Sequence, residues 1–212
     1  MKRRLVTALM GVVCLWLGNM SKADMLTLYP TNDAYVNSAE PASVHNGNSV
    51  NAGYYSGAIT RSYLMFNLSA IPDNQLIVSA LLRLDTSYFA PTAPVVGAYY
   101  LENDGWFEST LTWNNAPTNF HTPATDTQLI IIQEVFWTVN SDVSHAYGVD
   151  DKYSVVMKLP DEVPGAEAGF WSKDAGISAW SPYLKIEYQP IPEPATLLLL
   201  GLGGLILRKR RA

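Results

Sequence analysis

The chain has 212 residues, of which 48% are hydrophobic and 16% are charged, and its formal net charge is −5. Most of the basic residues lie at the two ends, so residues 24–189 hold six basic and 18 acidic side chains, a formal net charge of −12. A domain this acidic repels nucleic acid and an anionic membrane surface, so we exclude both as partners of residues 24–189.

The first 23 residues have the layout of a secretory signal peptide. Residues 2–4 are basic, residues 5–17 are apolar apart from Thr7, and Ser21 and Ala23 supply the small side chains expected before a cut at Asp24. We expect cleavage between Ala23 and Asp24; the alternative is a buried N-terminal helix. The only cysteine, Cys14, lies in the removed part, so we expect a mature chain without a thiol or a disulfide.

Residues 24–189 have the length of one domain, and their apolar residues alternate with the period of two that is typical of half-buried strands. Leu64, Phe66 and Leu68 share one face of residues 61–68. One face of residues 76–84 holds Val78, Ala80, Leu82 and Leu84. We expect further strands at residues 26–29, 34–37, 95–101, 110–113, 129–139, 153–159, 169–172 and 183–188.

Loops rich in Asn, Gly, Pro and Ser separate these strands, and no amphipathic helix of ten or more residues is evident. Only residues 140–147 suggest a short helical turn, which Asp142 would cap. Many short strands without helices predict an all-β fold, either a two-sheet antiparallel sandwich or a barrel. We favour the sandwich, flanked by an N-terminal signal helix and a short C-terminal hydrophobic helix.

Several motifs within residues 26–188 occur in a recognisable order. They include Asp33-Ala34-Tyr35-Val36, Arg61–Leu68, Phe170–Asp174 and, the most specific, Trp106-Phe107-Glu108-Ser109-Thr110-Leu111-Thr112-Trp113-Asn114-Asn115-Ala116-Pro117. In this order they resemble the DNRLRE-type domain, a family common in bacterial surface proteins. The resemblance implies a jelly-roll sandwich over residues 24–189, grouped with the carbohydrate-binding modules.

The C-terminal tail, residues 190–212, combines three features. Pro192-Glu193-Pro194 precedes a 13-residue apolar run, residues 195–207, which ends at Arg208, Lys209, Arg210 and Arg211. As a helix this run measures about 20 Å, too short for a hydrocarbon core of about 30 Å. The tail resembles the PEP-CTERM sorting signal; the alternative is an ordinary membrane anchor.

That resemblance implies a sequence of events during export from a Gram-negative bacterium. The apolar run inserts transiently into the inner membrane with its basic end on the cytoplasmic side. An exosortase then cuts near Pro192–Pro194. The protein finally reaches the cell surface or the extracellular matrix.

Catalytic signatures are sparse, so we predict that the protein is not an enzyme. His45, His121 and His145 lack the spacing of metal ligands, and no nucleophile elbow or phosphate loop is present. Glu102, Asp104 and Glu108 lie close together in the sequence, but the segment reads as a turn in which Glu108 accepts backbone hydrogen bonds.

The resemblance also implies that the domain could hold a structural calcium ion, because jelly-roll carbohydrate modules often hold one. Calcium takes oxygen ligands, and the pairs Asn32–Asp33 and Asp150–Asp151 are candidate donors. The alternative is that these residues belong to solvated loops.

Aromatic residues carry the argument for a ligand, because sugar rings stack on them. We assign Trp113 and Trp171 to the core. In Tyr54–Tyr55 and in Tyr99–Tyr100, alternation turns one ring of each pair outward, so these four are the candidate exopolysaccharide-binding residues. The alternatives are a structural matrix protein without a specific ligand and, least favoured, a small polysaccharide-degrading enzyme.

Overall fold

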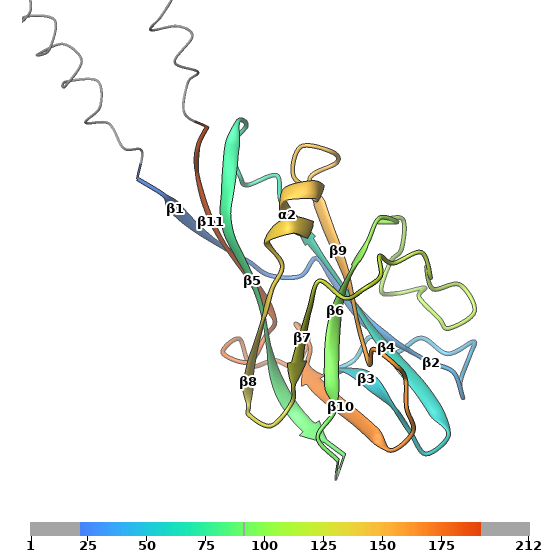
Figure 1. The fold of residues 1–212 in the computed structure, drawn as a ribbon. Coiled ribbons are helices and arrows are strands. Elements are labelled where there is room, and N and C mark those ends of the chain that lie inside the picture. The colour runs from blue at the N-terminus through green and yellow to red at the C-terminus, as the bar shows by residue number, and fades with distance from the viewer. Residues whose placement is uncertain (1–21, 91, 192–212) are drawn as a thin grey trace, which may run out of the picture.

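A computed structural model describes residues 22–90 and 92–191, which form 11 strands and one short helix (Figure 1). The strands are β1 (Asp24–Leu28), β2 (Asn32–Asn37), β3 (Ser49–Tyr55), β4 (Ala58–Asn67), β5 (Gln75–Phe89), β6 (Val95–Leu101), β7 (Asp126–Leu129), β8 (Glu134–Thr138), β9 (Lys152–Lys158), β10 (Ala166–Trp171) and β11 (Tyr183–Pro190). The helix is α2 (Asn140–Ala146). The all-β class predicted from the sequence is confirmed.

The strands form one curled, antiparallel sheet rather than two separate sheets. The hydrogen-bonded path runs β1-β11-β5-β10-β3-β4-β9-β6-β7, with β2 added to β4 and β8 added to β5. Strand β10 pairs with both β3 and β5, and it thereby joins the two halves that a sandwich would keep apart. The predicted two-sheet sandwich is therefore not confirmed.

The main core fills the inside of the curl. Its largest buried side chains include Trp137, Phe66, Phe170 and Tyr153. The predicted face of β4 is confirmed for Leu64, Phe66 and Leu68, which all lie in this core.

A second core lies on the opposite face of β4. It contains Tyr63, Tyr99, Trp106 and Leu111. Residues 102–125, which we call the covering segment, lie over this face and supply Trp106 and Leu111. Strands β4 and β6 are thus buried on both faces.

The predicted face of β5 is wrong at Val78. Ala80, Leu82 and Leu84 are buried as predicted, but Ile77 is buried and Val78 is exposed. The register of β5 against β11 passes directly from Ser79 to Ile77, which leaves Val78 as the extra residue of a β-bulge. A bulge reverses the alternation beyond it, so the period-two pattern fails there.

Three other elements differ from the prediction. Strand β3 was not expected, residues 110–113 form turns, and residues 129–139 divide into the end of β7, a turn and β8. Helix α2 has no side-chain cap, because its N-cap residue is Val139 and the predicted cap, Asp142, lies within the first turn. The Asp142 carboxylate accepts hydrogen bonds from the hydroxyls of Thr125 and Ser141.

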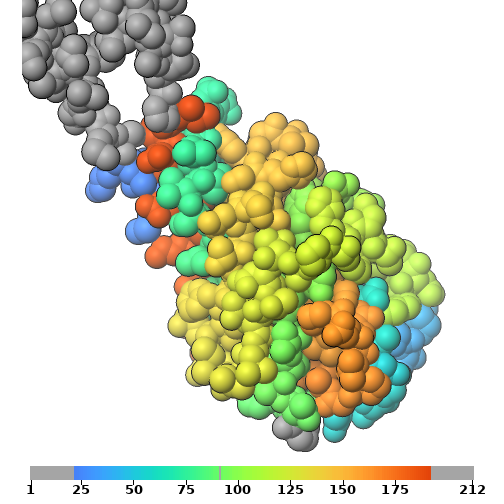
Figure 2. Space-filling model, viewed as in Figure 1, coloured from blue at the N-terminus to red at the C-terminus, as the bar shows by residue number. Residues whose placement is uncertain are grey.

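Both ends of the described chain lie at one end of the molecule. Strand β1 begins at Asp24, the predicted first residue of the mature chain, and pairs with β11, which ends at Pro190 (Figures 1 and 2). The signal helix and the C-terminal hydrophobic helix fall outside the described residues. Within those residues, no helix has both the length and the apolar character needed to cross a bilayer.

Candidate functional site

An exposed aromatic ring stands on the covering segment between two hollows. Phe107 is 63% exposed, whereas the preceding Trp106 is buried in the second core. The indole Nε1 of Trp106 donates a hydrogen bond of 3.3 Å to Ser154 Oγ on β9. The buried tryptophan thus anchors the segment and leaves its neighbour facing solvent.

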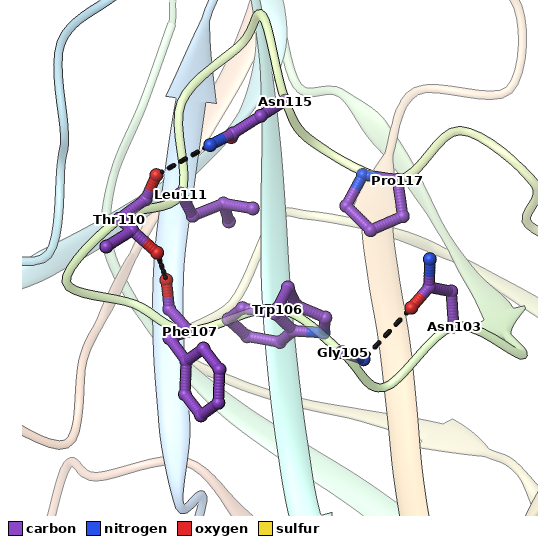
Figure 3. Close-up of a pocket in the computed structure, with 8 residues that line it drawn as sticks. All are labelled: Asn103, Gly105, Trp106, Phe107, Thr110, Leu111, Asn115 and Pro117. Atoms are coloured by element: carbon purple, nitrogen blue, oxygen red, sulfur yellow. Dashed lines mark hydrogen bonds between the residues drawn. The ribbon is translucent and has the colours of Figure 1, made fainter.

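The first hollow, of about 260 Å³, is formed within the covering segment (Figure 3). Trp106, Leu111 and Pro117 supply its apolar part. Asn103 and Asn115 line it too, and local hydrogen bonds hold both side chains. The side-chain oxygen Oδ1 of Asn103 accepts a hydrogen bond of 2.9 Å from the Gly105 N–H. The side-chain Nδ2 of Asn115 donates a hydrogen bond of 2.9 Å to the main-chain carbonyl of Thr110.

The second hollow, of about 440 Å³, shares Trp106 and Phe107 with the first. Its other lining residues come from the start of β2, the end of β4, the loop before β9 and the covering segment. They include the carboxylates Asp104, Asp150 and Asp151, the amides Asn32 and Asn67, and the charged side chain of Lys152. Phe107 is therefore flanked by polar groups on both sides.

Asp104 stands out in the second hollow because its Oδ1 atom is buried and has no hydrogen-bond partner. Burial raises the pKa of the Asp104 carboxyl to about 6, and the neighbouring Asp150 carboxylate adds to the rise. An unpaired buried carboxylate oxygen beside a second carboxylate is a donor set that suits a hard cation such as calcium. Of the predicted donors, Asp150 and Asp151 both line this hollow, and calcium binding there stays a prediction.

A second acidic cluster lies beside Phe107 and contacts a lysine. The Lys173 ammonium lies 2.9 Å from Glu108 Oε2, 2.6 Å from Asp174 Oδ2 and 3.8 Å from Asp33 Oδ1. The three carboxylates approach within 4.8 Å of one another, and this single ammonium compensates only part of their negative charge. A metal ion bound by these three carboxylates would have to displace the Lys173 ammonium, so calcium at the predicted donor pair Asn32–Asp33 stays a prediction.

The lysine cluster joins three motifs that are far apart in the sequence. The Asp33 N–H donates to Glu108 Oε2 at 3.0 Å, and the Lys173 N–H donates to Asp33 Oδ2 at 2.7 Å. The predicted role of Glu108 as an acceptor of backbone hydrogen bonds is confirmed. These contacts fix the base of the covering segment directly beside Phe107.

Most of the chain matches a known protein family. Residues 24–188 match carbohydrate-binding module family 96. The chain belongs to this family. The family 96 match covers the whole sheet, from the first residue of β1 to Tyr188 in β11.

Two further similarities accompany the family 96 module. Residues 190–211 match the PEP-CTERM protein-sorting motif, which marks exported proteins that are processed at the membrane by an exosortase. The chain is also 27% identical over 184 residues to a protein named gellan lyase from Bacillus sp.. The match covers 84% of this chain but only 7% of the length of that protein.

The four tyrosines predicted to bind ligand lie away from Phe107. Tyr55 is 44% exposed and Tyr54 is half-buried, on β3. The prediction that one ring of the second pair faces solvent is wrong, since Tyr99 is 4% and Tyr100 is 6% exposed. Both faces of β6 are covered, so Tyr99 packs in the second core and Tyr100 in the main core.

The two tryptophans predicted to be core residues are only partly buried. Trp113 packs against the second core with the Arg61 guanidinium 4.9 Å from the centre of its ring. Trp171 stacks on Trp180 at 5.1 Å. Trp106 and Trp137 instead hold the buried positions.

The three acidic residues that were weighed for catalysis do not converge. Glu102 lies 2.9 Å from His121 Nε2, Asp104 lines the second hollow, and Glu108 contacts Lys173. His121 and His145 both pack edge-on against Tyr100, a proximity that their spacing did not predict.

Phe107 was not predicted from the sequence as a ligand-binding residue. It lies in the stretch Trp106–Pro117, directly after Trp106. In a motif with a buried tryptophan, the adjacent aromatic residue is the one that can point outward, and this was the available signal.

Proposed function

We propose that this module binds a polysaccharide at the Phe107 site and does not catalyse a reaction. The observation that carries the proposal is the exposed Phe107 ring between two hollows lined by amides, hydroxyls and carboxylates. Sugars present C–H faces that stack on aromatic rings and hydroxyls that bond to polar groups at the edge of the ring. The match to carbohydrate-binding module family 96 supports the same class of ligand.

The energy expected from one exposed ring is modest. A stacked aromatic contact adds about 1 kcal/mol beyond the burial of apolar area. A single site of this kind binds weakly, and retention on a polymer then depends on repeated engagement of many modules. The module is therefore suited to association with an extended matrix rather than to capture of a free oligosaccharide.

The net charge of −12 restricts the polysaccharide. A bare polyanion meets repulsion over the whole surface, so the ligand is neutral, basic or bridged by calcium. Calcium fits the second hollow best, where Asp104 and Asp150 would hold it. The ion would supply a positive charge next to Phe107.

The sorting motif supports a route for the protein. In this proposal the signal peptide is cut between Ala23 and Asp24, and the tail inserts transiently into the inner membrane. An exosortase cuts near Pro192–Pro194, and the protein joins the cell surface or the exopolysaccharide matrix. In the same proposal, the module is a domain of the DNRLRE type.

Affinity electrophoresis in gels containing the producer's own exopolysaccharide tests binding. Phe107→Ala should abolish most of the retardation, while Tyr55→Ala, which removes an exposed ring on β3, should leave it unchanged. Equal retardation of the Phe107→Ala variant and the wild type would reject the site. No retardation of the wild type, with or without calcium, would reject binding.

A second candidate function is polysaccharide cleavage, because the chain is similar to a protein named gellan lyase. The shared 7% of that protein is weak support, because a short part of a large enzyme can lie outside its catalytic region. Incubation with gellan and with the producer's exopolysaccharide, followed by measurement of new reducing ends and of unsaturated ends, decides between cleavage and binding. A structural matrix protein without a ligand is the outcome if neither is found.

A further inference from the structure

The last strand of the sheet ends almost at the sorting motif. Gln189 is paired with Leu76 and Pro190 with Gln75 in the β5–β11 ladder. The Ile191 N–H then donates to the Asn74 carbonyl at 3.2 Å. Backbone pairing therefore continues to the residue directly before Pro192.

A clamp holds the turn that receives this end of the chain. The Tyr147 hydroxyl donates to the Pro72 carbonyl and accepts a hydrogen bond of 3.1 Å from the Gln75 N–H. Asn74 lies between these two residues with a φ of 60°. Tyr147 thus links the end of α2 to the turn between β4 and β5, and through Asn74 to Ile191.

The sequence leaves little free chain beyond this point. Only Pro192, Glu193 and Pro194 separate Ile191 from the apolar run that begins at Ala195. Three residues span about 10 Å when fully extended. Proteolytic enzymes engage an extended and unpaired chain, which is why cutting concentrates where the backbone is free of secondary structure.

We propose that the β5–β11 end gates removal of the sorting signal. While β11 stays paired through Pro190, the membrane endopeptidase lacks free chain on the N-terminal side of Pro192, and cleavage requires local opening of this end. The reaction breaks one peptide C–N bond; the acyl group passes to water or to an amine acceptor, and the released amine of the tail takes up the proton. Local opening costs less than global unfolding, so the gate can act in a folded domain.

This inference rests on the cleavage proposed above, and a reversible cross-link tests it. Leu76→Cys with Gln189→Cys joins directly opposed residues on antiparallel strands, at a spacing that disulfides accept. In exporting cells the cross-linked full-length precursor should be cut at least about tenfold more slowly than the same variant treated with reductant. Insertion of Gly-Ser-Gly-Ser between Ile191 and Pro192 should restore cleavage while the cross-link stays intact.

A pair of matched variants tests the clamp without a cross-link. Tyr147→Phe removes both hydrogen bonds at the turn and should speed cleavage severalfold. Tyr63→Phe removes a tyrosine hydrogen bond in the second core and should leave the rate unchanged. If the cross-linked precursor is cut as fast as the reductant-treated variant, the gate is overturned. If the reductant-treated variant is not cut at all, the processing proposal is overturned as well.

Discussion

Asp33 is the most deeply buried carboxylate near the proposed site. Its side chain is fully inaccessible, and Oδ1 has no hydrogen-bond partner. Burial raises the pKa of the Asp33 carboxyl to about 6, although the Lys173 N–H and the Lys173 charge oppose the rise. Ionisation of the Asp33 carboxyl therefore lowers the free energy of unfolding of the protein.

The sign of the resulting pH dependence follows from the direction of this shift. An unfolded Asp has a pKa of about 3.9, so between about pH 4 and 6 the folded protein holds more protons than the unfolded chain. The Asp33 contribution to the free energy of unfolding then falls as the pH rises through this window. From this group alone, the protein should be more stable at pH 5 than at pH 7.5 by about 1.4 kcal/mol.

Asp33→Asn should remove the part of this pH dependence that comes from Asp33, whereas the part from Asp104, whose pKa burial also raises, should remain. Urea unfolding of the wild type and of the variant at pH 5 and at pH 7.5 measures the effect, with Asp73→Asn as a control at an exposed carboxylate. An unchanged pH dependence in Asp33→Asn would contradict the assignment to this group.

Asp104 supports a prediction about calcium. If Asp104 and Asp150 hold the ion, calcium at 100 times its dissociation constant should stabilise the wild type by about 2.7 kcal/mol. Asp104→Asn should lose most of that gain, whereas Asp33→Asn should keep it because Asp33 does not line the second hollow. Melting temperatures with calcium and with a chelator measure both. Equal calcium shifts in the wild type and in Asp104→Asn would place the ion elsewhere.

Individual residues mark the limit of prediction from the sequence. Alternation places Tyr99 and Tyr100 on opposite faces of β6, and this is correct. It does not reveal that the covering segment, which follows β6 directly, packs on one face and the main core on the other. Exposure depends on long-range packing, so neither tyrosine could be excluded as a ligand residue before the structure was known.

Among the elements, the covering segment depends most on single contacts. The Tyr63 hydroxyl donates to the Pro117 carbonyl at 3.0 Å. Arg61 lies over Trp113 and Phe120, and its guanidinium also pairs with Glu162 at 2.7 Å. The covering segment forms its own turns and is attached to β4 by these contacts.

Tyr63→Phe should loosen the covering segment and cost about 1 kcal/mol of stability, because the half-buried Pro117 carbonyl loses its donor. Limited proteolysis should then cut within residues 102–125 faster than in the wild type. Tyr147→Phe, at the end of α2, serves as the control because it removes tyrosine hydrogen bonds outside the covering segment. If both variants expose residues 102–125 equally, the hydrogen bond is not what holds the segment.

The elements also explain which predictions succeeded. Strands β4, β9 and β11 agree with the sequence pattern because each carries a run of alternating or continuous apolar residues. Strand β3 was missed because Asn51 and Gly53 weaken its pattern. Residues 110–113 were misread as a strand because the Asn115 carbonyl oxygen accepts the Thr112 N–H at 2.7 Å, a side-chain contact that makes a turn.

At the scale of the whole molecule, the proposed ligand site lies apart from the end of the described chain that precedes the sorting motif. The termini lie together at the β1–β11 end, and the covering segment with Phe107 lies on another side (Figure 1). A chain held through its C-terminal tail would therefore keep the Phe107 site clear of its attachment point. Processing and ligand binding can then proceed independently.

The overall charge leads to a prediction about the type of ligand. Retention on a neutral glycan should change little between low and high salt, because stacking and neutral hydrogen bonds are not screened. Retention on an anionic glycan should vanish with a chelator. Affinity gels with neutral and anionic polysaccharides, run with calcium or chelator, measure both. Strong retention on a polyanion in chelator would contradict the charge argument.

The central claim is that a glycan contacts the Phe107 site, and the indole resonances of the tryptophans test it most directly. Trp106 Nε1–H lies beside the site and donates to Ser154, whereas Trp137 Nε1–H donates to the Val96 carbonyl in the main core. In a titration with fragments of the producer's exopolysaccharide, we expect the Trp106 indole signal to shift while the Trp137 signal stays fixed. A shift confined to Trp171 and Trp180, with Trp106 unmoved, would contradict the account.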